Sequence, residues 1–523
     1  MKGYEAIARA LLDCGSETVF GLLGDANLFV MHAFTQNGGC YIGAVHEASA
    51  VCMADGFARQ TGNVGVATVT HGPGLTNAVT ALTEAARCRT PLLLLVGDTP
   101  PNVRFHLQDI DQQAVVQPTG AAFIQVETIS TIGSVLSGAF QQARRERRPV
   151  VLNVPVDLEW EEVRYEPVEV PEAEGSRELD LSAMDRALGI MASAARPLIL
   201  VGRGVAADAR PSVLELSDLL DAPVATSLLA KGAFDGKPGS IGVFGTLATD
   251  EALTTIAAAD VIVALGASLN RWTTADGTLL AGKAVVQVDT DPSAFGRFCE
   301  IDVPVLGDID AFARITVESL AEAEYRSSGF RSRIVPHKRV RSTEYGLPAV
   351  ADLLTSSMAP NTSLVCGAGR FSVPLLQRLV LPEGGRCTHT MHFGTIGLAT
   401  ANAIGAAVAK PEVTTVAVVG DGGFMLGGFT ELVTAVRAGV PLVLVVINDG
   451  SYGAEYIQLV RAGLDPGLAL LEWPDLAAGA RALGANAHTV RDLPELESMG
   501  SVISGHPAGP VVIDIHLDPA SVG

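Results

Sequence analysis

Two short polar segments near the end of the chain have residue types that could bind a metal ion and a phosphate. Gly420-Asp421-Gly422 follows an apolar run and precedes the helical pattern Phe429–Arg437, so we expect its carboxylate beside free N–H groups. The next apolar run ends at Asn448-Asp449-Gly450-Ser451, which offers a second side-chain oxygen and a backbone carbonyl. Such N–H groups bind phosphate, and Mg²⁺ prefers hard oxygens. Together the segments predict half of a magnesium and phosphate site, although each alone could be an ordinary turn.

The segment around Asp421 has a counterpart in the first part of the chain. An apolar run leads into His71-Gly72-Pro73-Gly74, as another leads into Gly420-Asp421-Gly422. In both places an amphipathic helix pattern and a second apolar run follow, and 20 residues separate His71 from Pro91 and Asp421 from Pro441. A strand, a turn, a helix and a second strand in this order form a βαβ unit, in which the two strands are parallel. Proteins with such sheets bind ligands beyond the carboxyl ends of the strands. The repeat therefore predicts two homologous domains whose glycine-rich turns could hold parts of one ligand.

The expected architecture is α/β, with three doubly wound parallel-sheet domains, of which the first and third are homologous. The first domain covers residues 1–165, the central one residues 180–325 and the last one residues 345–523. Buried strands of the central domain are predicted at Pro197–Val201, Val261–Leu265 and Ala284–Asp289, and linkers at Glu159–Glu178 and Tyr325–Pro348.

Charge and composition exclude several classes of partner. The 523 residues have a formal charge of -21, which makes binding to nucleic acid or to an anionic membrane unfavourable. The basic run Arg144–Arg148 is interpreted as the solvated end of a helix. We therefore expect a small-molecule partner, with no nucleic acid and no membrane.

The cysteines and the start of the chain favour a cytoplasmic protein. Seven cysteines are dispersed without a CxxC spacing, which predicts reduced thiols and neither a disulfide framework nor a zinc site. The chain begins with an amphipathic helix pattern, and no apolar run has the form of a signal peptide or a membrane span. Neither a P-loop nor a Gly-x-Ser-x-Gly elbow is present, which disfavours kinases and serine hydrolases.

The two polar segments resemble the thiamine-diphosphate signature of the 2-oxo acid decarboxylase and acetolactate synthase family. They are Gly420-Asp421-Gly422 and the segment beginning at Asn448, with 25 residues between Gly422 and Asn448. The resemblance covers nearly the whole chain. It implies an N-terminal pyrimidine-binding domain, a central domain and a C-terminal diphosphate-binding domain, with Mg²⁺ held by Asp421, Asp449 and the carbonyl of Ser451. The usual Asn is replaced by Asp449, which should tighten the demand for a divalent metal, and Asn448 remains the alternative ligand.

Glu47 lies on a mostly apolar helix pattern, His46–Arg59, where a lone carboxylate is unusual. The pattern alone leaves open a solvent-facing acid. The resemblance implies that Glu47 shares a proton with the aminopyrimidine ring of the cofactor, and a buried carboxyl with a raised pKa would suit that role.

Other residues are assigned to the cofactor by resemblance. Ile396 matches the bulky apolar residue that wedges the cofactor into its V shape, although it could be a core isoleucine. Gly367-Ala368-Gly369 matches a second diphosphate loop, a weak motif by itself. The full set of expected cofactor-binding residues is Gly72, Asn77, Gly367, Ala368, Gly369, Gly394, Ile396, Gly420, Gly422, Gly423, Tyr452 and Gly453.

Four residues are candidates for the substrate side of the site. Asp25 resembles the acid that pyruvate-decarboxylase-type enzymes offer to the bound intermediate, and Gln108 matches the synthase glutamine beside the thiazolium. His71 and His392 could carry protons near the reaction centre. Each of these could instead be a turn, packing or hydrogen-bonding residue.

The family resemblance implies an enzyme that decarboxylates a 2-oxo acid to an enamine, which is protonated or transferred to an aldehyde or ketone acceptor. The segment after Tyr452-Gly453 lacks the Gln-Trp of true acetolactate synthases, and Gly523 directly follows the last strand, without the usual C-terminal lid. Alternatives are a flavin-dependent oxidase of the same fold and a non-catalytic cofactor-binding homologue. The family also implies a homodimer or homotetramer with sites at the subunit interface. The sequence does not indicate FAD, and it does not select the substrate or acceptor.

Overall fold

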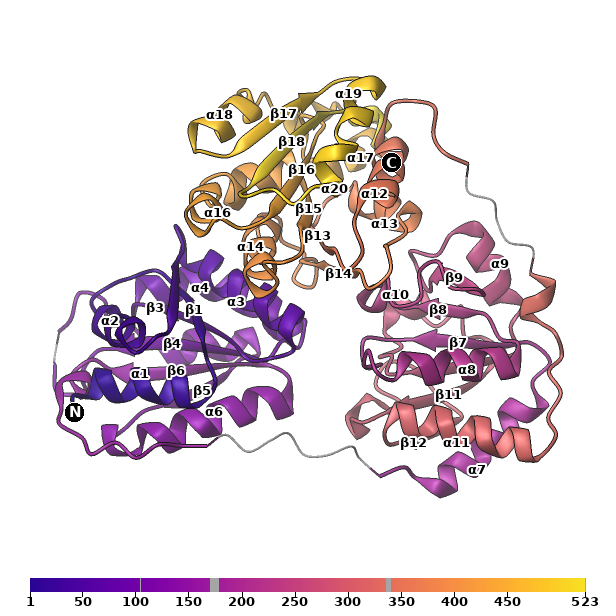
Figure 1. Cartoon of the computed structure of the whole chain (residues 1–523), viewed down its shortest axis with the longest axis horizontal. Coiled ribbons are helices and arrows are strands. Elements are labelled where there is room, and N and C mark those ends of the chain that lie inside the picture. The colour runs from indigo at the N-terminus through magenta and orange to yellow at the C-terminus, as the bar shows by residue number, and fades with distance from the viewer. Residues whose placement is uncertain (104, 170–177, 335–339, 523) are drawn as a thin grey trace. The chain divides into compact units, whose positions relative to one another are not determined.

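A computed structural model describes residues 1–103, 105–169, 178–334 and 340–522 (Figure 1). Its chain forms two compact units. The first contains Met1–Ala173, Thr362–Ser372 and Thr388–Gly523, and the second contains Glu174–Asn361 and Val373–Cys387. Both predicted linkers lie partly outside the described residues, and the exact domain boundaries stay a prediction.

The first sheet of the first unit is parallel and has the strand order β2-β1-β3-β4-β6-β5. Its central strand β4 is a continuous apolar run that is buried on both sides, as expected for a parallel sheet covered by helices. The strands are β1 (Thr18–Gly21), β2 (Cys40–Gly43), β3 (Gly65–Val69), β4 (Leu92–Asp98), β5 (Ala122–Gln125) and β6 (Pro149–Pro155). The helices are α1 (Gly3–Asp13), α2 (Leu28–Gln36), α3 (Glu47–Thr61), α4 (Pro73–Arg87), α5 (Gln112–Val116) and α6 (Ile132–Glu146).

The second sheet of this unit has the order β14-β13-β15-β16-β18-β17, which repeats the order of the first sheet strand for strand. This match confirms that the first and third domains share one fold. The strands are β13 (Ser363–Cys366), β14 (Arg386–His389), β15 (Thr415–Gly420), β16 (Leu442–Asn448), β17 (Asn486–Val490) and β18 (Val511–His516). The helices are α14 (Ala399–Ala409), α15 (Asp421–Gly423), α16 (Leu432–Ala438), α17 (Gly453–Arg461), α18 (Leu476–Ala482), α19 (Leu493–Ser498) and α20 (Gly500–Ser504). The preceding helices, α12 (Leu347–Ser357) and nearly all of α13 (Ser372–Arg378), are part of the second unit.

The second unit holds a third parallel sheet, with the order β12-β11-β10-β7-β8-β9. All three strands predicted for the central domain are present at their predicted bounds, as β7, β10 and β11. The strands are β7 (Pro197–Val201), β8 (Val224–Thr226), β9 (Ser240–Val243), β10 (Val261–Leu265), β11 (Ala284–Asp289) and β12 (Val303–Leu306). The helices are α7 (Leu181–Ser193), α8 (Arg210–Leu220), α9 (Asp250–Ala258), α10 (Arg271–Thr274) and α11 (Ile309–Glu322).

The two domains of the first unit pack through α3 and α14 and share one hydrophobic core. The helices approach closely because each has a glycine at the crossing. A Cβ on Gly56 would overlap the carbonyl of Asn402, and a Cβ on Gly405 would overlap the carbonyl of Met53. The small-residue helix α14 therefore packs against α3 with the two backbones in close contact.

One predicted element is placed differently. The helix expected at Phe429–Arg437 begins at Asp421, continues through the π-helical segment Phe424–Gly428, and becomes α16 only at Leu432. The glycines of this segment give no apolar periodicity, which is why the sequence pattern placed the helix start too late.

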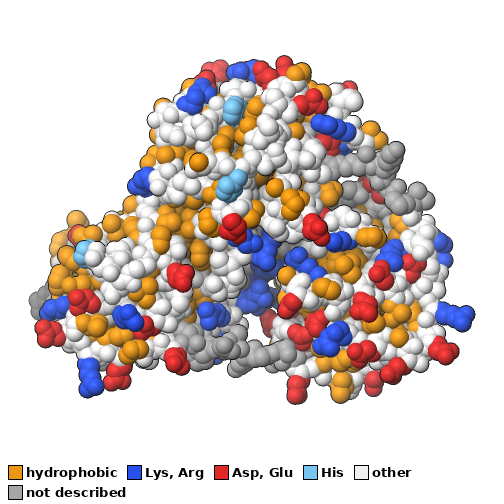
Figure 2. Space-filling view, viewed as in Figure 1, with side chains coloured by type: hydrophobic (Ala, Val, Ile, Leu, Met, Phe, Trp, Pro, Cys, Tyr) orange, Lys and Arg blue, Asp and Glu red, His pale blue; other side chains and the backbone are white. Residues whose placement is uncertain are grey.

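The surface shows charges of both signs. Figure 2 shows acidic and basic side chains interspersed over the visible face of each unit. Among the described residues, no helix is long and apolar enough to cross a membrane. The basic run is the end of α6, as predicted, with Arg144 and Arg145 in its last turn.

Candidate functional site

A cavity of about 780 Å³ lies at the carboxyl ends of β13, β15 and β16. Both turns that the sequence singled out contribute to its wall, and so does the turn before α14. The described residues that line it are Ala368, Gly369, Arg370, Phe371, Ser372, Met391, Gly394, Thr395, Ile396, Gly420, Asp421, Gly422, Gly423, Ile447, Asp449, Ser451, Tyr452, Gly453, Ala454 and Glu455. Most of the residues predicted to hold the diphosphate are therefore brought together.

The Asp421 carboxylate is buried at the start of α15. The N–H of Gly422 donates to Oδ1 at 2.8 Å, and the N–H of Gly450 donates to Oδ2 at 2.9 Å. Trp473 Nε1 also donates to Oδ2, at 3.0 Å. These three bonds fix the carboxylate between the two predicted turns.

Asp449 is the second carboxylate of the cavity. The backbone N–H and the hydroxyl of Ser451 donate to its Oδ1 at 3.0 and 2.8 Å. Asn448 does not line this cavity, because its side-chain amide donates to Asp514 Oδ1 at 2.9 Å. This arrangement favours Asp449 over Asn448 as a ligand, and the ligand assignment itself remains a prediction.

Burial and mutual repulsion destabilise the two charges in the metal-free chain. Burial raises the pKa of Asp421, and the nearby Asp449 carboxylate raises it further, to about 6. Burial also raises the pKa of Asp449. The described residues contain no group of three or more His, Cys, Asp or Glu side chains arranged to hold a metal ion. A cation here would therefore need oxygens from a phosphate or water in addition to these two carboxylates.

Glycines in the wall of the cavity leave its backbone accessible, as the binding of a diphosphate requires. A Cβ on Gly422 would lie 2.8 Å from the Tyr452 ring, and one on Gly453 would lie 3.2 Å from Cβ of Arg370. Ile396 packs over the turn, since a Cβ on Gly423 would lie 3.6 Å from its Cβ. Glycine is thus the residue that fits, and the buried carboxylates and close backbone approach match a metal-bound diphosphate.

Glu47 and Asn77 form a pair in the N-terminal domain. Asn77 Nδ2 donates to Glu47 Oε2 at 3.0 Å. Glu47 is half-buried at the first turn of α3. The single chain therefore does not bury this carboxyl fully, as its expected role would favour. Neither residue lines the 780 Å³ cavity.

Three other candidates gather at the ends of β1, β3 and β4. The buried His71 ring lies 3.3 Å from His106, between Nε2 and Nδ1, and burial together with the His106 ring lowers the pKa of His71. Asp25 is exposed and near enough to His71 to act on its pKa. Gln108 packs against Gly72, where a Cβ would overlap the Gln108 carbonyl. The predicted substrate-side residues Asp25, His71 and Gln108 are therefore neighbours.

His392 is placed differently from a free proton carrier. Its Nδ1 lies 2.8 Å from Oε1 of the buried Glu84, which comes from the N-terminal domain. Burial alone would lower the pKa of His392, but Cys88 and Glu84 raise it to about 9. His392 does not line the 780 Å³ cavity. Its predicted catalytic role stays a prediction.

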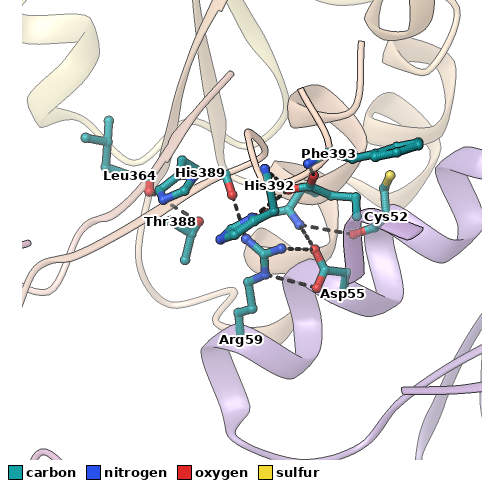
Figure 3. A network of polar contacts seen from close by, with 10 residues as sticks. Cys52, Asp55, Arg59, Leu364, Thr388, His389, His392 and Phe393 are labelled. Carbon is teal, nitrogen blue, oxygen red and sulfur yellow. Dashed lines mark hydrogen bonds and ion pairs between the residues drawn. The ribbon is translucent and has the colours of Figure 1, made fainter. Parts of the chain in front are cut away.

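Figure 3 shows the polar network around His392. Arg59, on α3, pairs with Asp55 at 2.6 Å and donates from Nη1 to the carbonyl of His389 at 2.7 Å. Asn402 Nδ2 donates to Asp55 Oδ2 at 2.8 Å. The ion pair itself lies within α3, and both of its members form hydrogen bonds to the C-terminal domain.

Sequence reasoning missed several residues that shape this region. Arg370 is the one cation among the described residues that line the cavity, and its guanidinium lowers the pKa of Asp449 against the effect of burial. Trp473, Glu84 and Glu431 were also missed. Trp473 lies outside both turns. Glu84 stands singly on α4 and Glu431 singly just before α16, so no spacing pattern marked them.

Comparison with known protein families accounts for this arrangement. Residues 1–115 match the N-terminal TPP binding domain of the thiamine pyrophosphate enzymes, residues 184–315 match their central domain, and residues 367–515 match their C-terminal TPP binding domain. The chain belongs to the thiamine pyrophosphate enzyme family. Its cofactors are thiamine diphosphate and Mg²⁺, as predicted.

The curated relatives cover almost the whole chain. A probable acetolactate synthase large subunit of Methanocaldococcus jannaschii is 28% identical over 562 residues, covering 99% of this chain and 92% of the relative. Acetolactate synthase isozyme 3 large subunit of Escherichia coli is 28% identical, with 95% and 91% covered. The acetolactate synthase large subunit of Parasynechococcus marenigrum is 29% identical, with 99% and 88% covered. The comparisons give no support to either alternative function.

Proposed function

We propose that the protein is a decarboxylase or carboligase of the acetolactate synthase type, which removes CO₂ from a 2-oxo acid and passes the remaining fragment to a proton or to a carbonyl acceptor. The observation that supports this most is the cavity that joins Asp421, Asp449 and the turn of Ile396. When bound, thiamine diphosphate supplies the carbanion and the electron sink for decarboxylation. The chain itself supplies binding, orientation and proton control.

In this proposal the C-terminal domain holds the metal and the diphosphate. Asp421, Asp449 and the Ser451 carbonyl bind Mg²⁺, with Asn448 as the alternative side chain. Backbone N–H groups of the Gly420–Gly423 turn would bind phosphate oxygens. Gly367-Ala368-Gly369, Gly394, Tyr452 and Gly453 would surround the diphosphate, and Ile396 would pack against the cofactor.

The N-terminal domain contributes proton control. Glu47, held by a hydrogen bond from Asn77, would contact the aminopyrimidine and control its protonation, and Gly72 would lie at the edge of the same site. Asp25, His71 and Gln108 face the substrate. His71 stays neutral near pH 7 because its pKa is lowered, which suits a group that accepts a proton.

We further propose a homodimer or homotetramer in which each site joins two chains. Glu47 is absent from the wall of the cavity in its own chain, so a second copy would have to supply it. The surface beside the cavity carries several exposed apolar side chains. It includes Tyr452 (40% exposed), Val460 (43%), Leu464 (59%), Leu468 (93%) and Leu470 (47%). A second copy would cover this surface. The cytoplasmic location likewise remains a prediction.

The test is a panel of 2-oxo acids supplied with thiamine diphosphate and Mg²⁺, with CO₂ and ketol products measured. We expect at least one acid to give CO₂, and Glu47→Gln to lower kcat by about 100-fold or more without preventing cofactor binding. Glu17→Gln, an exposed acid of the same domain, is the control. CO₂ release that continues at the same rate without thiamine diphosphate would contradict the proposal.

A further inference from the structure

Two buried glutamates join the domains of the first unit in a reciprocal way. Glu84 on α4, in the N-terminal domain, accepts hydrogen bonds from the backbone N–H groups of His392 and Phe393 at 3.1 and 2.6 Å. Glu431, just before α16 in the C-terminal domain, accepts from the N–H groups of Val45 and His46 at 2.9 and 3.0 Å. Each carboxylate thus holds two consecutive N–H groups of the other domain.

The held turns occupy equivalent places in the two sheets. Val45 and His46 lie between β2 and α3, and His392 and Phe393 lie between β14 and α14. β2 and β14 are the matching edge strands of the two repeated sheets. The first turn ends at Glu47, and the second leads through Gly394 to Ile396.

An arginine on each helical segment completes the contact. Arg437 Nη2 donates to the carbonyl of Gly43 at 2.6 Å, and Arg87 Nη1 donates to the carbonyl of His392 at 3.5 Å. Arg87 also lies over the ring of Phe393, at 4.6 Å. Since Pro91 and Pro441 occupy matching positions in the repeat, Arg87 and Arg437, each four residues earlier, are equivalent residues. The contact is therefore two-sided, with an acid and a base on each side.

Burial makes these contacts strong and specific. Glu84 is 1% exposed and Glu431 is 0% exposed. A buried carboxylate without donors is very unfavourable, so each glutamate strongly favours the one position of the opposite turn that offers it two N–H groups. A backbone held by a charge-assisted pair of bonds has little freedom to rotate.

We propose that Glu84 and Glu431 are positioning residues, a reciprocal pair of clamps that set the turns carrying Glu47 and Ile396. Glu431 acts through the first turn of α3 on the direction of the Glu47 carboxylate. Glu84 acts through Gly394 on Ile396, which packs over the Asp421 turn. This inference rests on the proposed function, because Glu47 and Ile396 are its proton-exchanging and cofactor-shaping residues. Both clamps would act by positioning these residues before the reaction begins. Such positioning matters because proton exchange needs its groups placed within a fraction of an ångström.

The test compares Glu84→Gln with Glu431→Gln in the full chain with thiamine diphosphate and Mg²⁺, by hydrogen exchange of backbone amides. Glutamine keeps the size and removes the charge. We expect Glu84→Gln to speed exchange about tenfold in peptides covering 390–397 and to leave 43–47 unchanged, and Glu431→Gln to do the opposite. Glu17→Gln should change neither.

A second readout is the exchange rate of the C2 proton of the bound cofactor, which a merely structural role would leave unchanged. We expect both variants to slow it about tenfold while the Kd for the cofactor changes less than about threefold. Wild-type exchange rates at C2 in both variants, or equal loosening of both turns by either variant, would overturn the clamps.

Two milder variants cover the case in which a glutamate variant does not fold. Arg87→Gln removes the contacts to the His392 carbonyl and the Phe393 ring, and Arg437→Gln removes those to the Gly43 carbonyl and the Thr434 hydroxyl. Both leave the glutamates in place, and we expect the same turn-specific pattern at about threefold. Absence of that pattern would overturn the proposal. If the wild-type chain binds no thiamine diphosphate, the proposed function fails, whereas the amide pattern still decides whether the clamps exist.

Discussion

At the scale of single residues, the buried pair Asp421 and Asp449 is the proposed binding site for the metal ion of the cofactor. Two carboxylates at one cavity repel each other, and burial adds to the cost, as the raised pKa of Asp421 shows. Mg²⁺ would remove that cost on binding. Arg370 lines the same wall and offsets part of the negative charge.

Replacing Asp449 with Asn separates the contribution of its charge from that of its shape. We expect the metal-free Asp449→Asn variant to be more stable, by about 1 kcal/mol, because the repulsion with Asp421 is gone. The Mg²⁺ concentration needed for half-maximal cofactor binding should rise about tenfold, since one anionic ligand is lost. Titration calorimetry and thermal melting check both expectations.

Asn448→Ala is the matched control for this experiment. It should leave the Mg²⁺ requirement unchanged and lower stability, because it leaves the buried Asp514 without its amide donor. A larger effect on Mg²⁺ binding from Asn448→Ala than from Asp449→Asn would return the ligand role to Asn448.

The pair of His392 and Glu84 predicts how stability depends on pH. The pKa of His392 is raised to about 9, so the protonated ring stabilises the folded chain fully below its ordinary pKa, and this contribution is lost as pH rises through about 9. The lowered pKa of Glu84 gives the opposite slope, with stability lost as pH falls below the ordinary pKa of Glu. The first unit should therefore be most stable between these limits.

His392→Asn checks this expectation. Thermal melting of the wild type should show a decrease in stability between pH 7 and pH 10 that amounts to at most about 3 kcal/mol, and the variant should lack that decrease. Equal alkaline slopes for the two proteins would show that His392 carries no charge in the folded chain.

At the scale of elements, the crossing of α3 and α14 depends on glycine. Gly56→Ala should lower the free energy of unfolding by about 2 kcal/mol or more, because the added methyl group overlaps the Asn402 carbonyl. Gly138→Ala, on the open side of α6, is the control and should be neutral or stabilising by up to about 1 kcal/mol. Denaturant unfolding measures both, and a tolerated alanine at position 56 would mean that the helices can separate.

The helices and strands also show which parts of the fold could be predicted from the sequence. The apolar runs of β7, β10 and β11 are long enough and sharply enough bounded to give their limits directly. The start of the helix after Asp421 could not be read in this way, because Gly422, Gly423 and the π-helical segment give no helical periodicity. The apolar pattern of the sequence therefore predicts whether a segment is a helix or a strand. The start of this helix, in contrast, depends on how the segment packs in the folded protein.

The same limit applies to the candidate site. Asp421 and Asp449 stand in turns that follow strands, where position alone suggests a ligand. Glu84 and Glu431 hold backbone N–H groups more than 300 residues away in the sequence. A side chain that binds backbone N–H groups cannot be recognised from the pattern of side chains in the sequence. Only the equivalent positions of Arg87 and Arg437 in the repeat indicated a contact there.

At the scale of the whole molecule, the separation of Glu47 from the cavity predicts complementation between chains. Glu47→Gln and Asp421→Ala should each be inactive. Mixed in equal amounts after dissociation and reassembly, they should recover about a quarter of wild-type activity, because half of the dimers then contain one intact site of two. The double variant in one chain, mixed with wild type, is the control for reassembly. A mixture that stays inactive while its dimers exchange would place the whole site within one chain.

The most direct test of the account is reconstitution of CO₂ release from a 2-oxo acid by chain stripped of metal and cofactor. We predict that thiamine diphosphate alone and Mg²⁺ alone restore little activity, that both together restore it, and that Asp421→Ala abolishes the joint effect. Release of CO₂ by the stripped protein, or full activity of Asp421→Ala with both cofactors, would contradict the account.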